Sequence, residues 1–274
     1  MTLAFCTEGD PRNPALILLH GFLGNTEDWS RVVSLLKQQF FCVSVDLPGH
    51  GGSAGVSAVS GFDDCCAQID TILKAIGVHT FWLAGYSMGG RVAMHYACRY
   101  RVGQTASCEA PDTVQLSGLI VESAHPGLQD EPSRQARKEH DYHWAERFRR
   151  EPLEVVLHDW YRQPVFADLS PEDRQVMVDQ RLSNEGGALA DMLEATSLSR
   201  QVCFYDALCR LPFPVLYICG ERDLKFQAIG QLFDECPTMN VHLQEKAGHK
   251  VHHACPTVYA DTILSFYSSM TERN

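Results

Sequence analysis

The segment Thr80-Phe-Trp-Leu-Ala-Gly-Tyr-Ser-Met-Gly-Gly-Arg-Val-Ala93 decides the fold of this 274-residue chain. An apolar run, Thr80–Ala84, leads directly into Gly85-Tyr-Ser-Met-Gly89, and a helical pattern follows over Gly89–Tyr100. Glycines on both sides of a serine permit a tight turn that raises the hydroxyl at the N-terminus of a helix. The G-x-S-x-G pattern therefore predicts that Ser87 is a nucleophile at the end of a buried strand.

Short apolar runs recur along the chain and alternate with amphipathic stretches. The other expected strands are Ala15–Leu19, Phe41–Val45, Leu119–Val121, Val215–Cys219 and Val241–Leu243. The helical patterns outside the middle of the chain are Trp29–Gln39, Phe62–Ile76, Gly89–Tyr100, Phe226–Cys236 and Pro256–Met270. Runs without alternation are typical of strands buried on both faces. The pattern predicts an α/β fold with a mostly parallel open sheet and helices on both faces.

One segment, residues 126–210, contains no strand-like run. Its helical patterns are Arg134–Arg149, Leu153–Trp160, Pro171–Leu182 and Ala188–Leu198. We expect a helical cap inserted before the strand that carries the catalytic acid, over a core formed by residues 1–125 and 211–274.

The formal net charge of −11 argues against nucleic acid and membrane surfaces as partners. A local cluster of arginines can still bind an anionic small molecule. The N-terminus lacks the basic and apolar regions of a signal peptide, so we expect a cytoplasmic protein. Nothing in the sequence indicates an oligomer. The eleven cysteines include no C-x-x-C pair and are interpreted as reduced, mostly buried side chains.

A serine nucleophile needs a base and an acid that orients the base. In this fold the acid and then the histidine follow the serine along the chain, each after a strand. Gly220-Glu-Arg-Asp223 follows one expected strand, and Gly248-His249 follows the next. We predict Asp223 as the acid, with Glu221 as the alternative, and His249 as the base.

Backbone N–H groups of Met88 and Phe22 are the expected oxyanion donors, since one follows the nucleophile and the other lies after the first core strand. His20 is interpreted as a structural hydrogen-bonding residue, and Asp46 precedes the serine and is assigned to a rigid turn. His252, His253 and Cys255 lack a second ligand pair at zinc spacing. We interpret them as a helix start with surface imidazoles and expect no metal.

These motifs, together with Asp46-Leu-Pro-Gly-His-Gly51, resemble the α/β-hydrolase superfamily over nearly the whole chain. A narrower resemblance is to the family of 2-succinyl-6-hydroxy-2,4-cyclohexadiene-1-carboxylate (SHCHC) synthases, lyases of menaquinone biosynthesis. It depends on four blocks: Gly85–Ala93, Glu122–Gln129, Asp159–Phe166 and Met192–Ser197.

The narrower resemblance implies elimination of pyruvate from an enolpyruvyl cyclohexene tricarboxylate, with the Ser-His-Asp triad as base and no cofactor. It also implies substrate contacts from Arg137, Arg181, Trp160 and Tyr161. Arg91 lies one helical turn after Ser87 and can face the same cleft. Guanidinium groups suit carboxylates because they bind both oxygens at once.

Two alternatives remain at this level. The same scaffold supports a serine esterase, a thioesterase or a carbon–carbon bond hydrolase, because many chemistries share the fold and the triad. A receptor that only binds a small molecule is the second.

Overall fold

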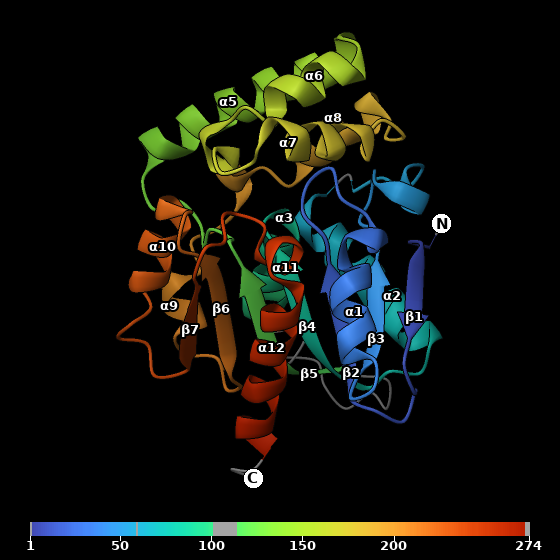
Figure 1. Ribbon diagram of the computed structural model, residues 1–274, viewed down its shortest axis with the longest axis vertical. Helices are drawn as coiled ribbons and strands as arrows, with labels where there is room; N and C mark the ends of the chain where they lie inside the picture. Colours follow the sequence, from blue (N-terminus) through green and yellow to red (C-terminus); the bar gives the residue numbers. More distant parts are fainter. Residues whose placement is uncertain (1, 59, 101–113, 272–274) are drawn as a thin grey trace.

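A seven-stranded sheet forms the centre of the computed structural model, which describes residues 2–58, 60–100 and 114–271. Its strand order is β1-β3-β2-β4-β5-β6-β7 (Figure 1). The strands are β1 (Phe5–Glu8), β2 (Ala15–Leu19), β3 (Phe41–Val45), β4 (Thr80–Tyr86), β5 (Gln115–Glu122), β6 (Val215–Gly220) and β7 (Met239–Gln244).

All neighbouring strands from β3 to β7 pair in parallel, and only β1 at the edge is antiparallel. Every residue of β2, β3 and β6 is buried, which explains their continuous apolar runs. The expected α/β architecture is confirmed. β5 begins four residues earlier than the sequence pattern indicates, because its first half mixes exposed and buried residues.

The helices lie in two layers beside the sheet and a third group above it (Figure 1). The α-helices are α1 (Ser30–Leu36), α2 (Phe62–Ala75), α3 (Met88–His95), α5 (Glu131–Arg150), α6 (Leu153–Trp160), α7 (Pro171–Asp179), α8 (Gly186–Ala195), α9 (Tyr205–Leu208), α10 (Leu224–Gln231), α11 (Val251–Ala254) and α12 (Pro256–Thr271). Single turns of 3-10 helix are η1 (Thr26–Trp29), η2 (Gly51–Ser53), η5 (Pro164–Phe166) and η6 (Leu198–Arg200), and η3 (Tyr96–Tyr100) is a π-helix.

Two apolar cores join these layers to the sheet. Side chains of α1 and α12 share one core with one face of the sheet, and those of α2, α3, α9 and α10 share the other core with the opposite face. Burial of both faces is what stabilises a parallel sheet.

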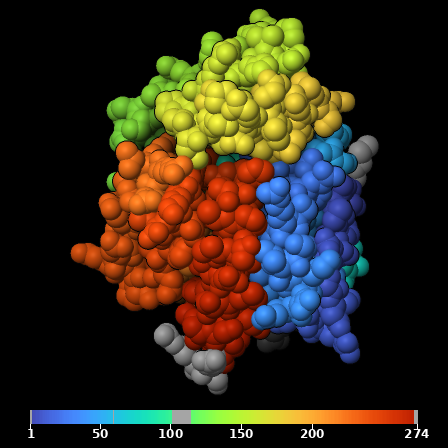
Figure 2. Space-filling model, viewed as in Figure 1, coloured from blue at the N-terminus to red at the C-terminus, as the bar shows by residue number. Residues whose placement is uncertain are grey.

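The cap helices, α5 to α8, lie between β5 and β6 in the chain and above the carboxyl ends of the strands (Figures 1 and 2). They have an apolar cluster of their own, which includes Phe148, Leu157 and Leu189. Leu23, from the loop after β2, joins that cluster. The cap helices are therefore packed onto the edge where the strands end.

The expectation that all cysteines are reduced is wrong at one pair. Cys209 and Cys236 form a disulfide between the segments before β6 and before β7; their Cα atoms are 5.0 Å apart. The other eight described cysteines are free thiols. No helix in residues 2–58, 60–100 and 114–271 is long and apolar enough to cross a membrane.

Candidate active site

Ser87 occupies the sharp turn between β4 and α3. Its φ of 51° and ψ of −107° are values that residues other than glycine rarely adopt. The flanking glycines allow the turn, because a Cβ atom on Gly89 would lie 2.3 Å from the Leu19 carbonyl oxygen. One on Gly85 would lie 2.4 Å from the Gly89 carbonyl oxygen. The turn places Ser87, partly exposed, at the N-terminus of α3.

The structure brings Ser87, His249 and Asp223 together from three loops at the carboxyl edge of the sheet. His249 Nε2 lies 3.3 Å from Ser87 Oγ, and His249 Nδ1 lies 2.6 Å from Asp223 Oδ2. The histidine and the aspartate are both buried. A carboxylate oxygen accepts, so Nδ1 carries the proton and the Nε2 lone pair faces the serine hydroxyl.

The two candidate acids have different partners. Asp223 Oδ1 also accepts a hydrogen bond from the Phe226 N–H at 3.4 Å and caps α10. Glu221 is exposed and accepts a hydrogen bond from the Lys246 N–H at 3.0 Å. Asp223 is therefore the carboxylate that contacts the imidazole, and Glu221 braces the neighbouring loop.

A second buried acid–histidine pair, Glu122 and His252, lies next to the Ser87 turn. Glu122 Oε2 accepts from His252 Nδ1 at 2.7 Å, and Glu122 Oε1 accepts from the His252 N–H at 3.1 Å. The carbonyl oxygen of Glu122 accepts from the Ser87 N–H at 2.8 Å. One residue thus connects the serine turn with α11, which begins two residues after His249.

The expectation of surface imidazoles is therefore wrong for His252, which is 1% exposed. Its ring stacks on Trp29 with a centroid distance of 4.3 Å. Within the described ranges, no group of three histidine, cysteine or acidic side chains could hold a metal ion.

The predicted oxyanion donors come from two different segments of the chain. Met88 is the first residue of α3, and Phe22 follows β2. Neither backbone N–H has a hydrogen-bond acceptor among residues 2–58, 60–100 and 114–271. Both N–H groups are therefore available to a negatively charged oxygen.

The loops after β2 and β3 are joined by two neutral histidines. His20 Nε2 accepts from the Leu47 N–H at 2.9 Å, and His50 Nε2 accepts from the Leu23 N–H at 3.1 Å. Burial lowers the pKa of His20 to about 4 and the pKa of His50 to about 3. Asp46 accepts from the Thr26 and Gly52 N–H groups. The structural role expected of His20 and the rigid turn at Asp46 are confirmed.

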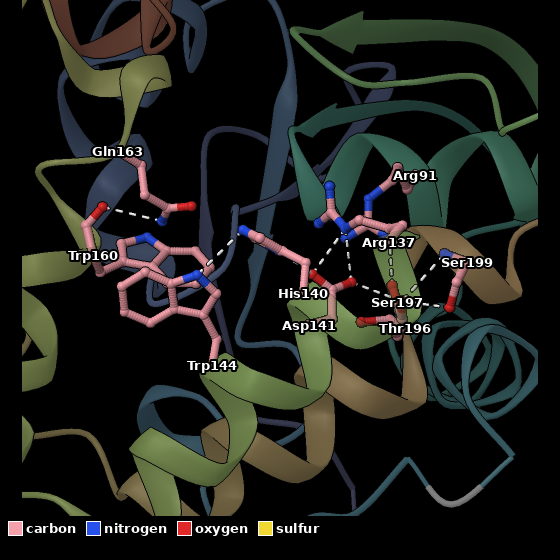
Figure 3. A network of polar contacts seen from close by, with 10 residues as sticks. All are labelled: Arg91, Arg137, His140, Asp141, Trp144, Trp160, Gln163, Thr196, Ser197 and Ser199. Carbon is pink, nitrogen blue, oxygen red and sulfur yellow. Dashed lines mark hydrogen bonds and ion pairs between the residues drawn. The ribbon is translucent and has the colours of Figure 1, made fainter. Parts of the chain in front are cut away.

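Two of the predicted arginines, Arg91 on α3 and Arg137 on α5, lie close together (Figure 3). Arg91 is buried and donates to the Thr196 carbonyl oxygen, and Arg137 Nε donates to both carboxylate oxygens of Asp141 at 2.8 Å. Burial, with the positive charge of Arg137, lowers the pKa of Arg91 to about 9. Arg91 is therefore charged at pH 7.

Arg181 is placed on another wall, beside a cavity of about 60 Å³ that His249 and Tyr161 also line. It donates to Asp28 at 2.5 Å, and Lys250 lies 3.2 Å from the same carboxylate. Burial opposes ionisation of Asp28, but Lys250 and Arg181 hold its pKa well below the usual range. This wall therefore carries two positive charges and one negative charge.

The aromatic residues of the cap form two separate groups of contacts. The ring centroid of Trp160 lies 4.9 Å from that of Phe22 and 5.0 Å from that of Trp144. Tyr161 is buried and packs on Phe166. Phe166 in turn contacts His249 edge-on at 5.9 Å. The cap thus contacts both Phe22 and His249.

Comparison with known proteins agrees with this architecture. Residues 14–254 match the family model described as alpha/beta hydrolase fold. The SHCHC synthase of Yersinia enterocolitica is 43% identical over 98% of this chain and 94% of its own length. That of Salmonella schwarzengrund is 45% identical over 93% of this chain and 94% of its own length. This chain belongs to the SHCHC synthase family of α/β hydrolases. Among solved structures, this SHCHC synthase family member is similar to MenH from S. aureus, with a TM-score of 0.86 and 26% identity over 98% of this chain and 99% of that one.

Several residues of this SHCHC synthase family member lie beside the predicted ones but were not predicted from the sequence. They are Glu122, Asp141, Lys225, Lys250 and His252. A charged residue that directly ends an apolar strand, as Glu122 does, is a usable signal, because buried charge requires a partner. The others have no local signal, since their partners are set by how the loops and the cap pack.

Proposed function

We propose that this protein eliminates pyruvate from 2-succinyl-5-enolpyruvyl-6-hydroxy-3-cyclohexene-1-carboxylate to give 2-succinyl-6-hydroxy-2,4-cyclohexadiene-1-carboxylate, in menaquinone biosynthesis. Membership of the SHCHC synthase family supports the reaction. The observation that carries it is that Arg91, one helical turn after Ser87, lies beside Arg137 (Figure 3). An esterase needs only the Ser-His-Asp triad, whereas an enzyme that binds a tricarboxylate also needs cationic side chains at the site.

The proposed reaction begins with proton transfer from Ser87 Oγ to His249 Nε2, while Asp223 stabilises the imidazolium. The serine oxygen then removes the ring proton α to the succinyl ketone. Electrons move through the ring double bond, the ring C–O bond breaks, and enolpyruvate leaves and becomes pyruvate. No water is added, so no acyl-enzyme is required.

Negative charge develops on the ketone oxygen during this step. The free N–H groups of Phe22 and Met88 are the proposed donors to it. Loss of one such donor in comparable sites costs about 3–4 kcal/mol. These hydrogen bonds stabilise the negative charge that forms on the ketone oxygen during the reaction. They therefore raise kcat rather than the affinity for the substrate.

The carboxylates of the substrate require positive partners. Arg91 and Arg137 bind one end, and Arg181, with one net positive charge on its wall, faces the other. Trp160 and Tyr161 cover the ring. Three carboxylates shared between two cationic walls fix the ring over Ser87, which is the positional contribution to the rate.

A direct test incubates the purified protein with the enolpyruvyl substrate and follows pyruvate release and diene absorbance. A p-nitrophenyl ester is the control substrate. We expect pyruvate and diene in equal amounts and at least 100 times faster turnover than of the ester. Ester hydrolysis without pyruvate release would assign the protein to the hydrolases of this fold.

A cytoplasmic location is part of the proposal. It is supported by the eight free thiols of the described residues, because such thiols are typical of reducing compartments; the Cys209–Cys236 disulfide does not support it. Fractionation of the native cell that places the protein outside the cytoplasm would contradict it.

A further inference from the structure

Asp141 on α5 is a fully enclosed carboxylate with three donors. It accepts from Arg137 Nε through both oxygens, from Ser197 Oγ at 2.7 Å and from His140 Nδ1 at 3.2 Å (Figure 3). Asp141 is 1% exposed. Burial would raise its pKa, but the donors from His140, Arg137 and Ser197 lower the pKa to about 2. Asp141 is therefore ionised at pH 7.

The contact with Arg137 leaves one end of the guanidinium unused. An ordinary arginine–carboxylate pair uses two N–H groups side by side, whereas Asp141 contacts only Nε. In the described part of the chain, the two terminal nitrogens of Arg137 have no hydrogen-bond acceptor. These two nitrogens form the planar fork that a further carboxylate fits.

Two consecutive residues directly after α8, Thr196 and Ser197, hold Arg91 and Arg137 in place. Arg91 donates to the Thr196 carbonyl oxygen, and Ser197 donates to Asp141, which holds Arg137. Arg91 lies one helical turn after Ser87. The Thr196–Ser197 segment therefore fixes the two guanidinium groups relative to each other and to the serine.

Lys225 is a third cation, and it lies near His249. It lies in the first turn of α10, and its Nζ is 5.4 Å from the Phe226 ring centroid, which is 4.8 Å from that of His249. Lys225 forms no ion pair within the described ranges. Although Lys225 is exposed, desolvation and the positive charge of Arg137 lower its pKa.

These charges do not cancel. Arg91, Arg137 and Lys225 are cations. The acids beside them are Asp141, which contacts Arg137, and Asp223, which acts on Lys225 but is paired with His249. Like charges at short range repel, so the group favours an anion between them. The unused fork of Arg137 and the unpaired ammonium of Lys225 indicate which groups receive that anion.

We propose that Lys225 binds the same substrate carboxylate as Arg91 and Arg137, and that Asp141, held by Ser197, is the positioning residue that turns the free end of Arg137 towards it. The inference deepens the proposed function and rests on it for the identity of the carboxylate.

The test compares Lys225→Met and Asp141→Asn with the wild-type protein. Two matched controls receive the same chemical changes elsewhere. They are Lys74→Met, at an exposed position of α2, and Asp63→Asn, whose carboxylate pairs with His95 at the opposite end of α3 from Ser87. The measurements are kcat and KM for pyruvate release. A third is the Kd of 2-succinylbenzoate, a stable aromatic mimic of the product, from tryptophan fluorescence.

We expect KM and Kd to rise at least tenfold in both variants, with kcat within threefold and both controls unchanged. An unchanged KM together with an unchanged Kd in Lys225→Met overturns the role of the lysine, and that exposed residue can be replaced without loss of the fold. An equal rise in Lys74→Met also overturns it, since the effect would then be one of net charge. A Tm within a few degrees of wild type shows that Asp141→Asn is folded, and an unchanged KM in it overturns the positioning role.

Failure of the proposed function gives a different result. A wild-type protein that releases no pyruvate refutes the reaction. Weaker mimic binding in Lys225→Met would still support the carboxylate subsite.

Discussion

Replacement of Asp223 by asparagine tests the orientation of the imidazole. The aspartate accepts from His249 Nδ1 at 2.6 Å in a buried contact. An asparagine amide in that position donates to Nδ1, so the ring proton moves to Nε2, which then points at the Ser87 hydroxyl. A protonated Nε2 cannot take the serine proton. The comparable change in a serine protease lowers kcat about 10⁴-fold, and we expect about 10³- to 10⁴-fold here, or about 4–5.5 kcal/mol.

The assay is pyruvate release at saturating substrate, with thermal unfolding as a check on the fold. Asparagine caps helices as well as aspartate does, so α10 is retained and Tm changes by only a few degrees. Glu221→Gln is the matched control, because its amide oxygen still accepts from the Lys246 N–H. We expect its kcat within threefold of wild type. If Asp223→Asn keeps more than one tenth of the wild-type kcat, or if Glu221→Gln loses as much, Asp223 is not the residue that orients the imidazole.

Three further predictions concern buried charges. Arg181→Met leaves the Asp28 carboxylate without its shortest ion pair and lowers the free energy of unfolding by about 3 kcal/mol; unchanged urea unfolding would contradict it. Glu122→Gln disturbs the contact with His252 and lowers kcat at least tenfold with KM unchanged; wild-type kcat would show that the pair is not needed. The folded pKa of Asp141, about 2, lies below its ordinary 3.8. Its contribution of about 2 kcal/mol is therefore present above pH 4 and lost as the pH falls towards 2. Urea unfolding of wild type and Asp141→Asn from pH 5 to pH 2 should show the difference shrinking.

The strands that position the site could be predicted because their sequences are apolar without alternation. Ala15–Leu19 and Phe41–Val45 have the predicted bounds, and all ten residues are buried. β1 was missed because three of the four residues in Phe5–Glu8 are exposed. The position of β1 depends on backbone pairing with β3. Such pairing gives no sequence signal in a strand of four residues.

The close approach of Ser87, Asp223 and His249 could be predicted because the carboxyl ends of parallel strands meet at one edge. The surroundings of the arginines could not. Arg181 pairs with Asp28, 153 residues away, and this contact depends on how the cap packs on the core. Asp141 and Ser197 meet for the same reason across 56 residues.

The histidine pattern near residue 252 shows the same limit. A helix start predicts exposure, whereas His252 is buried against Trp29 and Glu122. Tertiary packing of a four-residue helix decided the outcome, and such packing is independent of local propensity.

Joint measurement of pyruvate and conjugated diene in wild type and in Ser87→Ala tests whether the serine oxygen is the base. We expect equal amounts of the two products in wild type, and loss of both by at least about 10³-fold in the variant. Near wild-type pyruvate release from Ser87→Ala would contradict the claim that the serine oxygen removes the proton. So would pyruvate formed without diene, because hydrolysis of the ether would then replace elimination.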